Sequence, residues 1–268
     1  MTAYITFDRI KNGWIKLDDI FIVSENAWKK GGELSGSSTM FLKVNQKVTL
    51  SDLLRGMIVQ SGNDASICIA ENISGSEEEF VSLMNEYAEN LGMINTNFQN
   101  SSGWPDPDHY STMKDLAILS KSIINDFPEL YKIFSETEFT FNIKSPQYNR
   151  NRLLKTYEGT DGLKTGYVKN TGYGIAATSV KDGRRIIVVI NGLKSSKERT
   201  REAELLMNWA YNETKHFTII EKGQILSSVD TWLGKKNNID LISSEKILTT
   251  LDFEQSQNVT IKLSYNKY

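Results

Sequence analysis

Apolar residues in the first half of the chain recur every three or four positions, which is the spacing of amphipathic helices. Tyr4, Phe7 and Ile10 predict one such helix, which Gly13 ends, although no capping residue precedes it. A hydroxyl residue followed three positions later by an acidic residue forms a capping pair that opens a helix. Pairs of this kind predict helices that begin at Thr49, Ser76, Thr112 and Ser195.

A short polar corner separates two of the predicted helices. The helix that begins at Thr49 ends near Gln60, and we expect Asp64 to cap the next helix, whose apolar face is rich in isoleucine. The segment Ser61-Gly62-Asn63 therefore lies between two buried helices, where polar residues need an explanation.

Beyond residue 138 the apolar period shortens to the two-residue alternation of strands. This alternation predicts strands at 163–168, 174–180 and 185–191, and Asp182-Gly183 is a two-residue hairpin turn between the last two. Helices combined with an antiparallel sheet predict an α+β architecture. Further short strand-like pieces lie at 217–220, 225–229 and 259–263. We therefore expect two domains, a main domain at 1–216 and a β-rich appendage at 217–268.

Composition and charge describe an ordinary globular protein. Of 268 residues, 39% are hydrophobic and 24% are charged, and 31 Lys and Arg nearly balance 33 Asp and Glu, which gives a net charge of −2. This balance argues against a general electrostatic attraction to nucleic acid. The longest strongly apolar run, 186–190, is far shorter than the roughly 20 residues that span a bilayer, so we expect no membrane span.

Few residues are available for metal or redox chemistry. Cys68 is the single cysteine and there are two histidines, so we expect no disulfide within the chain, no metal site and no cofactor. We interpret Cys68 as a buried residue and His109 as part of a surface loop. We expect the tryptophans to belong to the core. The first ten residues lack the features of a signal peptide.

Two short motifs stand out from this background: Ser61-Gly62-Asn63 at the helix corner and Lys164-Thr165-Gly166 on a predicted strand. Each alone is weak evidence, because a Ser-x-Asn segment is most often a turn or a cap and a Lys-Thr-Gly segment is most often an exposed strand end. Their order is informative, since serine acyl-transferases that recognise penicillin carry Ser-x-x-Lys, Ser-x-Asn and Lys-Thr-Gly in that sequence.

The residues around both motifs extend this likeness. The segments 57–65 (MIVQSGNDA), 100–104 (NSSGW) and 161–167 (DGLKTGY), together with 36–42 and 201–204, resemble the D-alanyl-D-alanine carboxypeptidases, the low-molecular-mass penicillin-binding proteins. The resemblance covers roughly residues 1–216. It implies the β-lactamase-like, penicillin-binding transpeptidase fold, in which helices flank an antiparallel sheet beside an all-helical subdomain. The β-rich appendage would be a partial C-terminal domain.

Cleavage of a D-Ala-D-Ala bond needs a grip on the terminal carboxylate, an oxyanion hole and a proton donor for the leaving amine. Lys164 is the natural carboxylate anchor, because it is a cation between Gly162 and Gly166, where backbone can approach a peptide closely. Thr165 can donate a hydroxyl hydrogen bond to the same carboxylate. The resemblance assigns a backbone N–H at Tyr167 to the oxyanion hole.

The resemblance gives further residues their expected roles. Ser61 would relay a proton toward the leaving amine, and Asn63 would hold the substrate or the general-base lysine. Arg201 and Arg150 match positions that add positive potential around the carboxylate, although a solvated surface arginine is the competing interpretation for each. The expected ligands are the peptidoglycan pentapeptide that ends in D-Ala-D-Ala and, as in the family, β-lactams.

The nucleophile is the main departure from the family pattern. The family places Ser-x-x-Lys just before the segment that corresponds to Met1-Thr2-Ala3-Tyr4, so this chain as written lacks that serine and lysine and is expected to be inactive. Ser111-Thr112-Met113-Lys114 has the right spacing, but we interpret it as a helix cap. The first hypothesis is a serine-type D-Ala-D-Ala carboxypeptidase in the periplasm or otherwise outside the cytoplasmic membrane. The alternative is a non-catalytic homologue that binds peptidoglycan peptides or a partner; a class A β-lactamase is less favoured.

Overall fold

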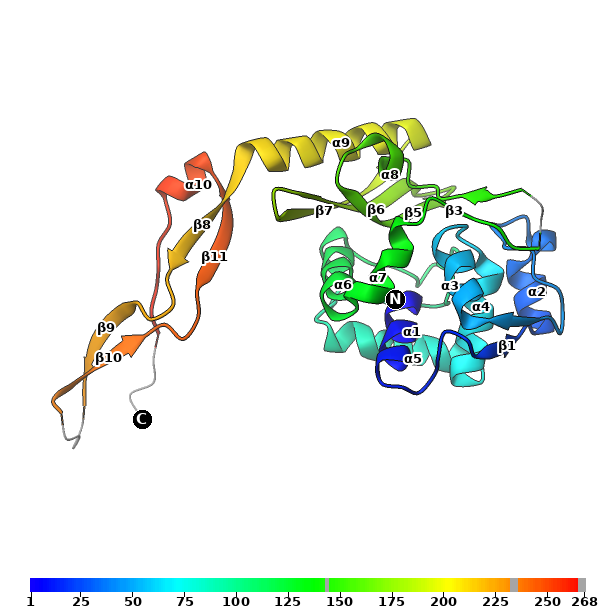
Figure 1. The fold of residues 1–268 in the computed structure, drawn as a ribbon, viewed down its shortest axis with the longest axis horizontal. Helices are drawn as coiled ribbons and strands as arrows, with labels where there is room; N and C mark the ends of the chain where they lie inside the picture. Colours follow the sequence, from blue (N-terminus) through cyan, green and yellow to red (C-terminus); the bar gives the residue numbers. More distant parts are fainter. Residues whose placement is uncertain (143–144, 232–235, 265–268) are drawn as a thin grey trace. The chain divides into compact units, whose positions relative to one another are not determined.

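A computed structural model describes residues 1–142, 145–231 and 236–264 (Figure 1). The chain divides into two compact units, Met1–Met207 and Asn208–Tyr268. Each unit has its own elements and is described separately below.

The first unit begins with a mainly helical part. Its longer helices are α1 (Thr2–Lys11), α2 (Glu25–Gly31), α3 (Leu50–Ile58), α4 (Asn63–Ser74), α5 (Glu77–Asn90) and α6 (Met113–Asp126). Its short helices are η1 (Glu33–Ser35), α7 (Pro128–Tyr131), η2 (Lys132–Ser135) and α8 (Leu153–Thr156). Two small antiparallel pairs join β1 (Ile20–Ile22) to β2 (Lys47–Thr49) and β3 (Glu138–Phe139) to β4 (Gln147–Tyr148).

Side-chain caps fix the beginnings of three of these helices, as the sequence predicted. Thr49, Ser76 and Thr112 each accept a hydrogen bond from the backbone N–H three residues later. The expectation that Asp64 caps α4 is wrong. Gly62 is the N-cap of α4, and Asp64 lies inside the first turn with its carboxylate turned toward backbone N–H groups of residues 40, 42 and 65.

A three-stranded antiparallel sheet follows the helices in the sequence. Its strands are β5 (Thr160–Val168), β6 (Gly172–Lys181) and β7 (Arg184–Leu193), in that spatial order. The register places Lys164 opposite Ala176. The predicted turn between β6 and β7 is confirmed, because Asp182 and Gly183 both have positive φ, at +50° and +74°, as the tightest hairpin turns require.

Two apolar cores hold the layers of the first unit together. α9 (Ser196–Glu213) and α8 lie over one face of the sheet and the other helices lie over the opposite face (Figure 1). The large core fills the helical part and reaches Leu163 of β5. The small core joins the sheet to α8 and α9 through Leu153, Ile175, Ala177, Val188, Ala203 and Met207. β5 is therefore anchored to the large core through Leu163, while its neighbours β6 and β7 anchor the sheet to the small core.

Surface residues correct one expectation about the aromatic core. Trp14, Trp104 and Trp209 are 66%, 48% and 54% exposed, so they are not core residues. The Trp14 ring instead packs under the Arg9 guanidinium, 4.0 Å from the ring centre.

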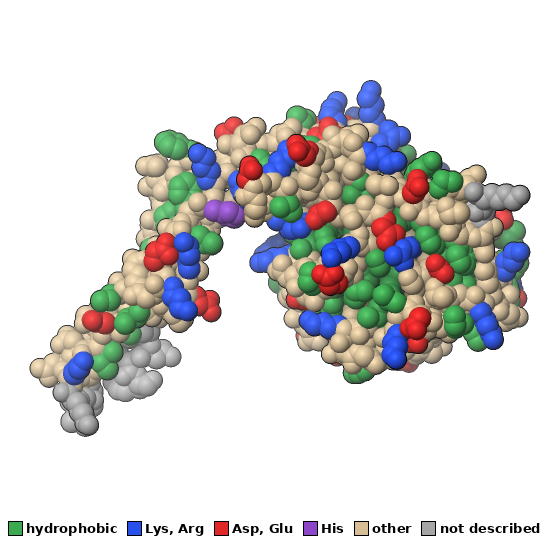
Figure 2. Space-filling view, in the orientation of Figure 1, with side chains coloured by type: hydrophobic (Ala, Val, Ile, Leu, Met, Phe, Trp, Pro, Cys, Tyr) green, Lys and Arg blue, Asp and Glu red, His purple; other side chains and the backbone are tan. Residues whose placement is uncertain are grey.

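Cys68 is buried as predicted, and burial raises the pKa of its thiol to about 12. Figure 2 shows side chains of both charges across the visible face of the first unit.

The second unit is built from two antiparallel strand pairs. β8 (Thr214–Ile220) pairs with β11 (Ile247–Asp252), and β9 (Ile225–Asp230) pairs with β10 (Asn238–Ile242). Residues 259–263, which the sequence predicts as a strand, form no strand. They follow α10 (Phe253–Gln257), which Asp252 and Gln255 open with a reciprocal capping box.

Among the described residues of both units, no helix combines the length and the apolar character that a membrane crossing demands.

The aromatic packing of α1 gives a stability prediction. Phe7 is fully buried and meets Phe127 and Phe134 edge to face. We expect Phe7→Ala to lower the free energy of unfolding by about 3–5 kcal/mol, because it leaves a cavity in the large core. Leu34→Ala, at a side chain 74% exposed, should change it by no more than about 0.5 kcal/mol. Urea unfolding followed by circular dichroism measures both, and equal losses would contradict this assignment of the core.

Candidate functional site

The corner between α3 and α4 presents Ser61 in an unusual backbone conformation. Ser61 has φ of +65°, which lies in the left-handed region that non-glycine residues rarely adopt. Gly62 follows, where a Cβ would approach the Asp64 carboxylate to 2.8 Å and Met40 N to 3.1 Å. The Gly62 N–H donates to Gly56 O at 2.9 Å. The corner is thus tight and closely surrounded by backbone.

Lys164 reaches this corner from the sheet. Its Nζ donates to Ser61 Oγ at 2.7 Å and to its neighbour's carbonyl, Thr165 O, at 3.0 Å. The two motifs that the sequence singles out, separated by about a hundred residues, therefore meet in space. Strand alternation explains the orientation, because Leu163 and Thr165 point their side chains into buried surroundings while Lys164 is less enclosed.

Burial and positive neighbours change the protonation of Lys164. Removal of the ammonium group from water lowers the pKa of Lys164 to about 7, and the charges of Arg150 and Arg199 act in the same direction. The amine is therefore poised between its charged and neutral forms near neutral pH. A group in that state can hold an anion when charged and can pass a proton through the hydroxyl of Ser61.

Arg199 is a site residue that our sequence reasoning missed. It is 5% exposed, and its guanidinium donates to Gly166 O and Arg150 O, both at 3.3 Å. The signal was present in the sequence, because Arg199 precedes Ala203 and Met207 at four-residue steps and so shares their buried face of α9. Arg201, the arginine expected at the site, lies on another face of α9.

The structure does not bring Arg201 to the Lys164 amine. Its guanidinium pairs with the adjacent Glu202 at 2.6 Å, and its side chain is 65% exposed. Arg150 does approach the site and donates to Ser38 Oγ at 2.6 Å, while burial lowers the pKa of its guanidinium. Arg199 and Arg150 are thus the two arginines that act on Lys164.

The remaining expected residues lie along the same two segments. The Asn63 backbone N–H donates to Ser38 O at 2.8 Å. Thr165 is 8% exposed. Gly166 has no atom within 4 Å of where a Cβ would stand, so the space beside the strand is open there. Tyr167 is 58% exposed, and its ring centre lies 4.4 Å from that of Tyr173 on β6.

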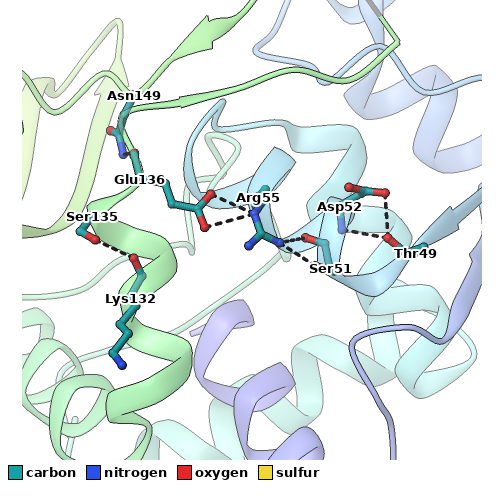
Figure 3. A network of polar contacts seen from close by, with 8 residues as sticks. All are labelled: Thr49, Ser51, Asp52, Arg55, Lys132, Ser135, Glu136 and Asn149. Atoms are coloured by element: carbon teal, nitrogen blue, oxygen red, sulfur yellow. Dashed lines mark hydrogen bonds and ion pairs between the residues drawn. The ribbon is translucent and has the colours of Figure 1, made fainter.

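A polar network holds the chain segment that carries Arg150. Arg55 of α3 donates through Nε to both oxygens of Glu136, at 3.1 and 2.9 Å, and through Nη1 to Ser51 Oγ (Figure 3). The Asn149 side chain donates to Glu136 O at 3.0 Å. Asn151 then donates to Gly162 O of β5, also at 3.0 Å. This segment therefore connects α3 to the strand of Lys164.

Within residues 1–142, 145–231 and 236–264, no three His, Cys, Asp or Glu side chains come close enough together to hold an ion. The groups assembled around Lys164 are amines, guanidiniums, hydroxyls and amides, which suit the binding of a carboxylate.

Comparison with known proteins decides the family. The sequence profile described as D-alanyl-D-alanine carboxypeptidase matches residues 1–195, and the profile described as penicillin-binding protein 5, C-terminal domain, matches residues 215–268. The chain belongs to the D-alanyl-D-alanine carboxypeptidase family. The resemblance noted from the sequence motifs is thereby confirmed.

Individual relatives of the carboxypeptidase family agree with this assignment. D-alanyl-D-alanine carboxypeptidase DacC of Escherichia coli K12 is 40% identical over 267 residues, which cover 99% of this chain and 66% of that protein. The crystal structure of penicillin-binding protein 5 from Haemophilus influenzae superposes with a TM-score of 0.85 at 38% identity, over 96% of this chain and 74% of that one. This likeness confirms the predicted α+β, penicillin-binding fold.

A more distant relative was crystallised with a β-lactam. Penicillin-binding protein D2 of Listeria monocytogenes, in its ampicillin-bound form, matches with a TM-score of 0.66 at 26% identity, over 79% of this chain and 84% of that one.

The chain spans about two thirds of the length of the curated carboxypeptidase DacC.

The lowered pKa of Lys164 predicts how stability depends on pH. Between about pH 7 and the ordinary lysine value of 10.5, the unfolded chain binds a proton at Lys164 that the folded chain does not. The free energy of unfolding should therefore rise with pH across this interval, with the penalty of the buried charge fully present below it. Urea unfolding over this range should show the rise in the wild type and a flatter curve in Lys164→Met. Parallel curves would contradict the shifted pKa.

Proposed function

We propose that this chain carries the substrate-binding and proton-relay residues of a serine-type D-alanyl-D-alanine carboxypeptidase that acts on peptidoglycan stem peptides. The observation that carries the proposal is the 2.7 Å hydrogen bond from Lys164 Nζ to Ser61 Oγ, with Arg150 and Arg199 as charged neighbours. Family membership supports it.

A peptide terminus would supply an anion that the described part of the chain does not bring to this cluster of cations. Among the described residues, no carboxylate forms an ion pair with Lys164, Arg150 or Arg199. Arg199 is buried and Lys164 is half-buried, and such cations are unfavourable without a counter-ion. A carboxylate that enters therefore gains both Coulomb attraction and charge-assisted hydrogen bonds. The C-terminal carboxylate of D-Ala-D-Ala fits this requirement, with Thr165 as an added hydroxyl donor.

Ser61 is placed to deliver a proton to the leaving group. When the D-Ala-D-Ala peptide bond breaks, the departing amine takes a proton, and Ser61 Oγ–H can give one. Lys164, which is hydrogen-bonded to that oxygen and has a pKa of about 7, can replace the proton from its ammonium form. The open side of Gly166 and the backbone N–H of Tyr167 would border the scissile carbonyl.

The nucleophile of this reaction is expected in a Ser-x-x-Lys motif, not at Ser61. The segment Ser111–Lys114 does not serve, because Ser111 Oγ bonds Thr96 Oγ1 at 2.8 Å beside the N-cap of α6 and Lys114 is exposed. The 268-residue polypeptide is therefore expected to bind stem peptides without forming an acyl-enzyme. A non-catalytic peptide-binding role is the second candidate, and the site residues named above suit both. Either role concerns peptidoglycan, which lies outside the cytoplasmic membrane.

Peptide binding tests the carboxylate anchor. Isothermal titration of diacetyl-L-lysyl-D-alanyl-D-alanine should give binding that Lys164→Gln weakens by about tenfold or more, because a charge-assisted hydrogen bond is lost. Lys114→Gln, at an exposed lysine of the rejected Ser-x-x-Lys segment, should bind as the wild type does. The same peptide with its C-terminus amidated should bind no better than the Lys164→Gln variant binds the acid. Equal affinity of acid and amide would contradict the anchor.

Covalent labelling separates catalysis from binding. We expect no adduct when the 268-residue polypeptide is incubated with fluorescent penicillin, because the proposed roles of Ser61 and Lys164 do not include attack. Mass spectrometry of tryptic peptides provides the readout. An adduct on Ser61 would overturn its assignment as a relay, and an adduct elsewhere would identify a nucleophile that the present assignment lacks. An in-frame Ser-x-x-Lys in the DNA directly before Met1 would favour the catalytic role.

A further inference from the structure

Asp64 is a fully buried carboxylate directly beside the Ser61 corner, and none of the roles above uses it. Its side chain accepts four hydrogen bonds: from Thr39 Oγ1 at 2.6 Å, Ala65 N at 2.9 Å, Met40 N at 3.0 Å and Leu42 N at 3.1 Å. Its exposed fraction is 0%. The donors come from two segments of the chain, so the carboxylate joins the start of α4 to residues 39–42.

Residues 39–42 are bent so that their amides converge on this carboxylate. Phe41 has φ of +64°, a left-handed conformation without the freedom of glycine, and the N–H groups on either side of it both point to Asp64. Ser61 has the same kind of conformation, with φ of +65°. Two strained turns thus flank one acceptor, and strained turns persist only where their surroundings hold them.

The same segment contacts the site directly through its neighbour Ser38. Ser38 O accepts the Asn63 N–H at 2.8 Å, and Ser38 Oγ accepts from Arg150 at 2.6 Å. The Gln60 side chain donates to Thr39 O at 3.2 Å, on the other side of Ser61. Residues before and after Ser61 are therefore both fastened to the segment that Asp64 holds.

We propose that Asp64 is a positioning residue, whose carboxylate holds residues 38–42 against the corner so that Ser61 meets Lys164 and Ser38 meets Arg150. The four donors need an acceptor with two negatively charged oxygens, and an amide would offer one oxygen and turn an N–H₂ group toward the other donors. Burial raises the pKa of Asp64, and the four hydrogen bonds oppose that change. The significance of this positioning role for peptide binding rests on the proposed function. The experiment that tests the role uses no substrate and does not rest on that function.

Asp115 provides a matched control within the same unit. It is 1% exposed and likewise accepts hydrogen bonds from a backbone N–H, Asn95 N at 2.8 Å, and from a threonine, Thr96 Oγ1 at 2.8 Å. It lies at the first turn of α6, and neither donor contacts the site. Asp115→Asn therefore reproduces the loss of a buried carboxylate without the loss of a site contact.

The readout is the pKa of Lys164, measured from its ¹³Cε chemical shift in the lysine-labelled 268-residue chain and assigned by its absence in Lys164→Met. Asp64→Asn should raise the pKa of Lys164 from about 7 by about 1 or more, because a displaced Ser61 lets water reach the amine and a released Arg150 moves its charge away. Thr39→Val should shift it in the same direction. Asp115→Asn should leave it unchanged, although it lowers the melting temperature.

The direction in which the pKa of Lys164 changes distinguishes a positioning role of Asp64 from the simple loss of its negative charge. Removal of a negative charge alone would lower the pKa of Lys164. A lower or unchanged value in folded Asp64→Asn therefore overturns the proposal. If Asp64→Asn does not fold, the same measurement on Thr39→Val decides: a raised pKa of Lys164 supports the proposal, and a lower or unchanged pKa overturns it. No substrate is involved, so failure of the peptide-binding experiment and failure of this one are separate results.

Discussion

The site depends on one contact, in which the amine of Lys164 is hydrogen-bonded to the hydroxyl of Ser61 and is partly shielded from solvent. Removal of an ammonium group from water is costly, and proteins usually offset the cost with a carboxylate. Lys164 instead has two guanidiniums as its charged neighbours, so the cost appears as a pKa of about 7. A lysine in this condition attracts an incoming anion and exchanges protons near neutral pH. In the function we propose, recognition of a terminal carboxylate and delivery of a proton would thus have a common origin in the desolvation of one amine.

The contact joins two parts of the first unit that are far apart in the sequence, so its length depends on the elements that connect them. The corner of α3 and α4 is tied to residues 38–42 through Asp64, and β5 is anchored to the large core through Leu163. Between them, the Arg55–Glu136 ion pair and the hydrogen bond from Asn151 to Gly162 hold the intervening segment on both sides. These groups touch no substrate in the proposed mechanism, but a functional site needs such support to keep its geometry.

Local rules predicted most of the fold, because capping pairs, apolar periods and the Asp182-Gly183 turn depend only on neighbours in the sequence. The same rules failed where the outcome depended on distant contacts. Asp64 has the residue type and the sequence position of an N-cap, yet its carboxylate accepts hydrogen bonds from the backbone N–H groups of residues 40 and 42. Motif likeness favoured Arg201, whereas the buried face of α9 selects Arg199. Residues 259–263 were predicted wrongly although Val259, Ile261 and Leu263 alternate with polar residues as in a strand. A strand also needs a neighbour to pair with, and among the described residues no strand pairs with this segment.

A double-mutant cycle on peptide affinity tests the central contact most directly. Affinity for diacetyl-L-lysyl-D-alanyl-D-alanine is measured for the wild type, Ser61→Ala, Lys164→Met and the double variant, with folding checked by circular dichroism. If the two side chains act as one unit, the effects are non-additive, with a coupling free energy of about 1 kcal/mol or more. Effects that add to within about 0.5 kcal/mol would show that Ser61 and Lys164 act independently, and would contradict the central role of their contact.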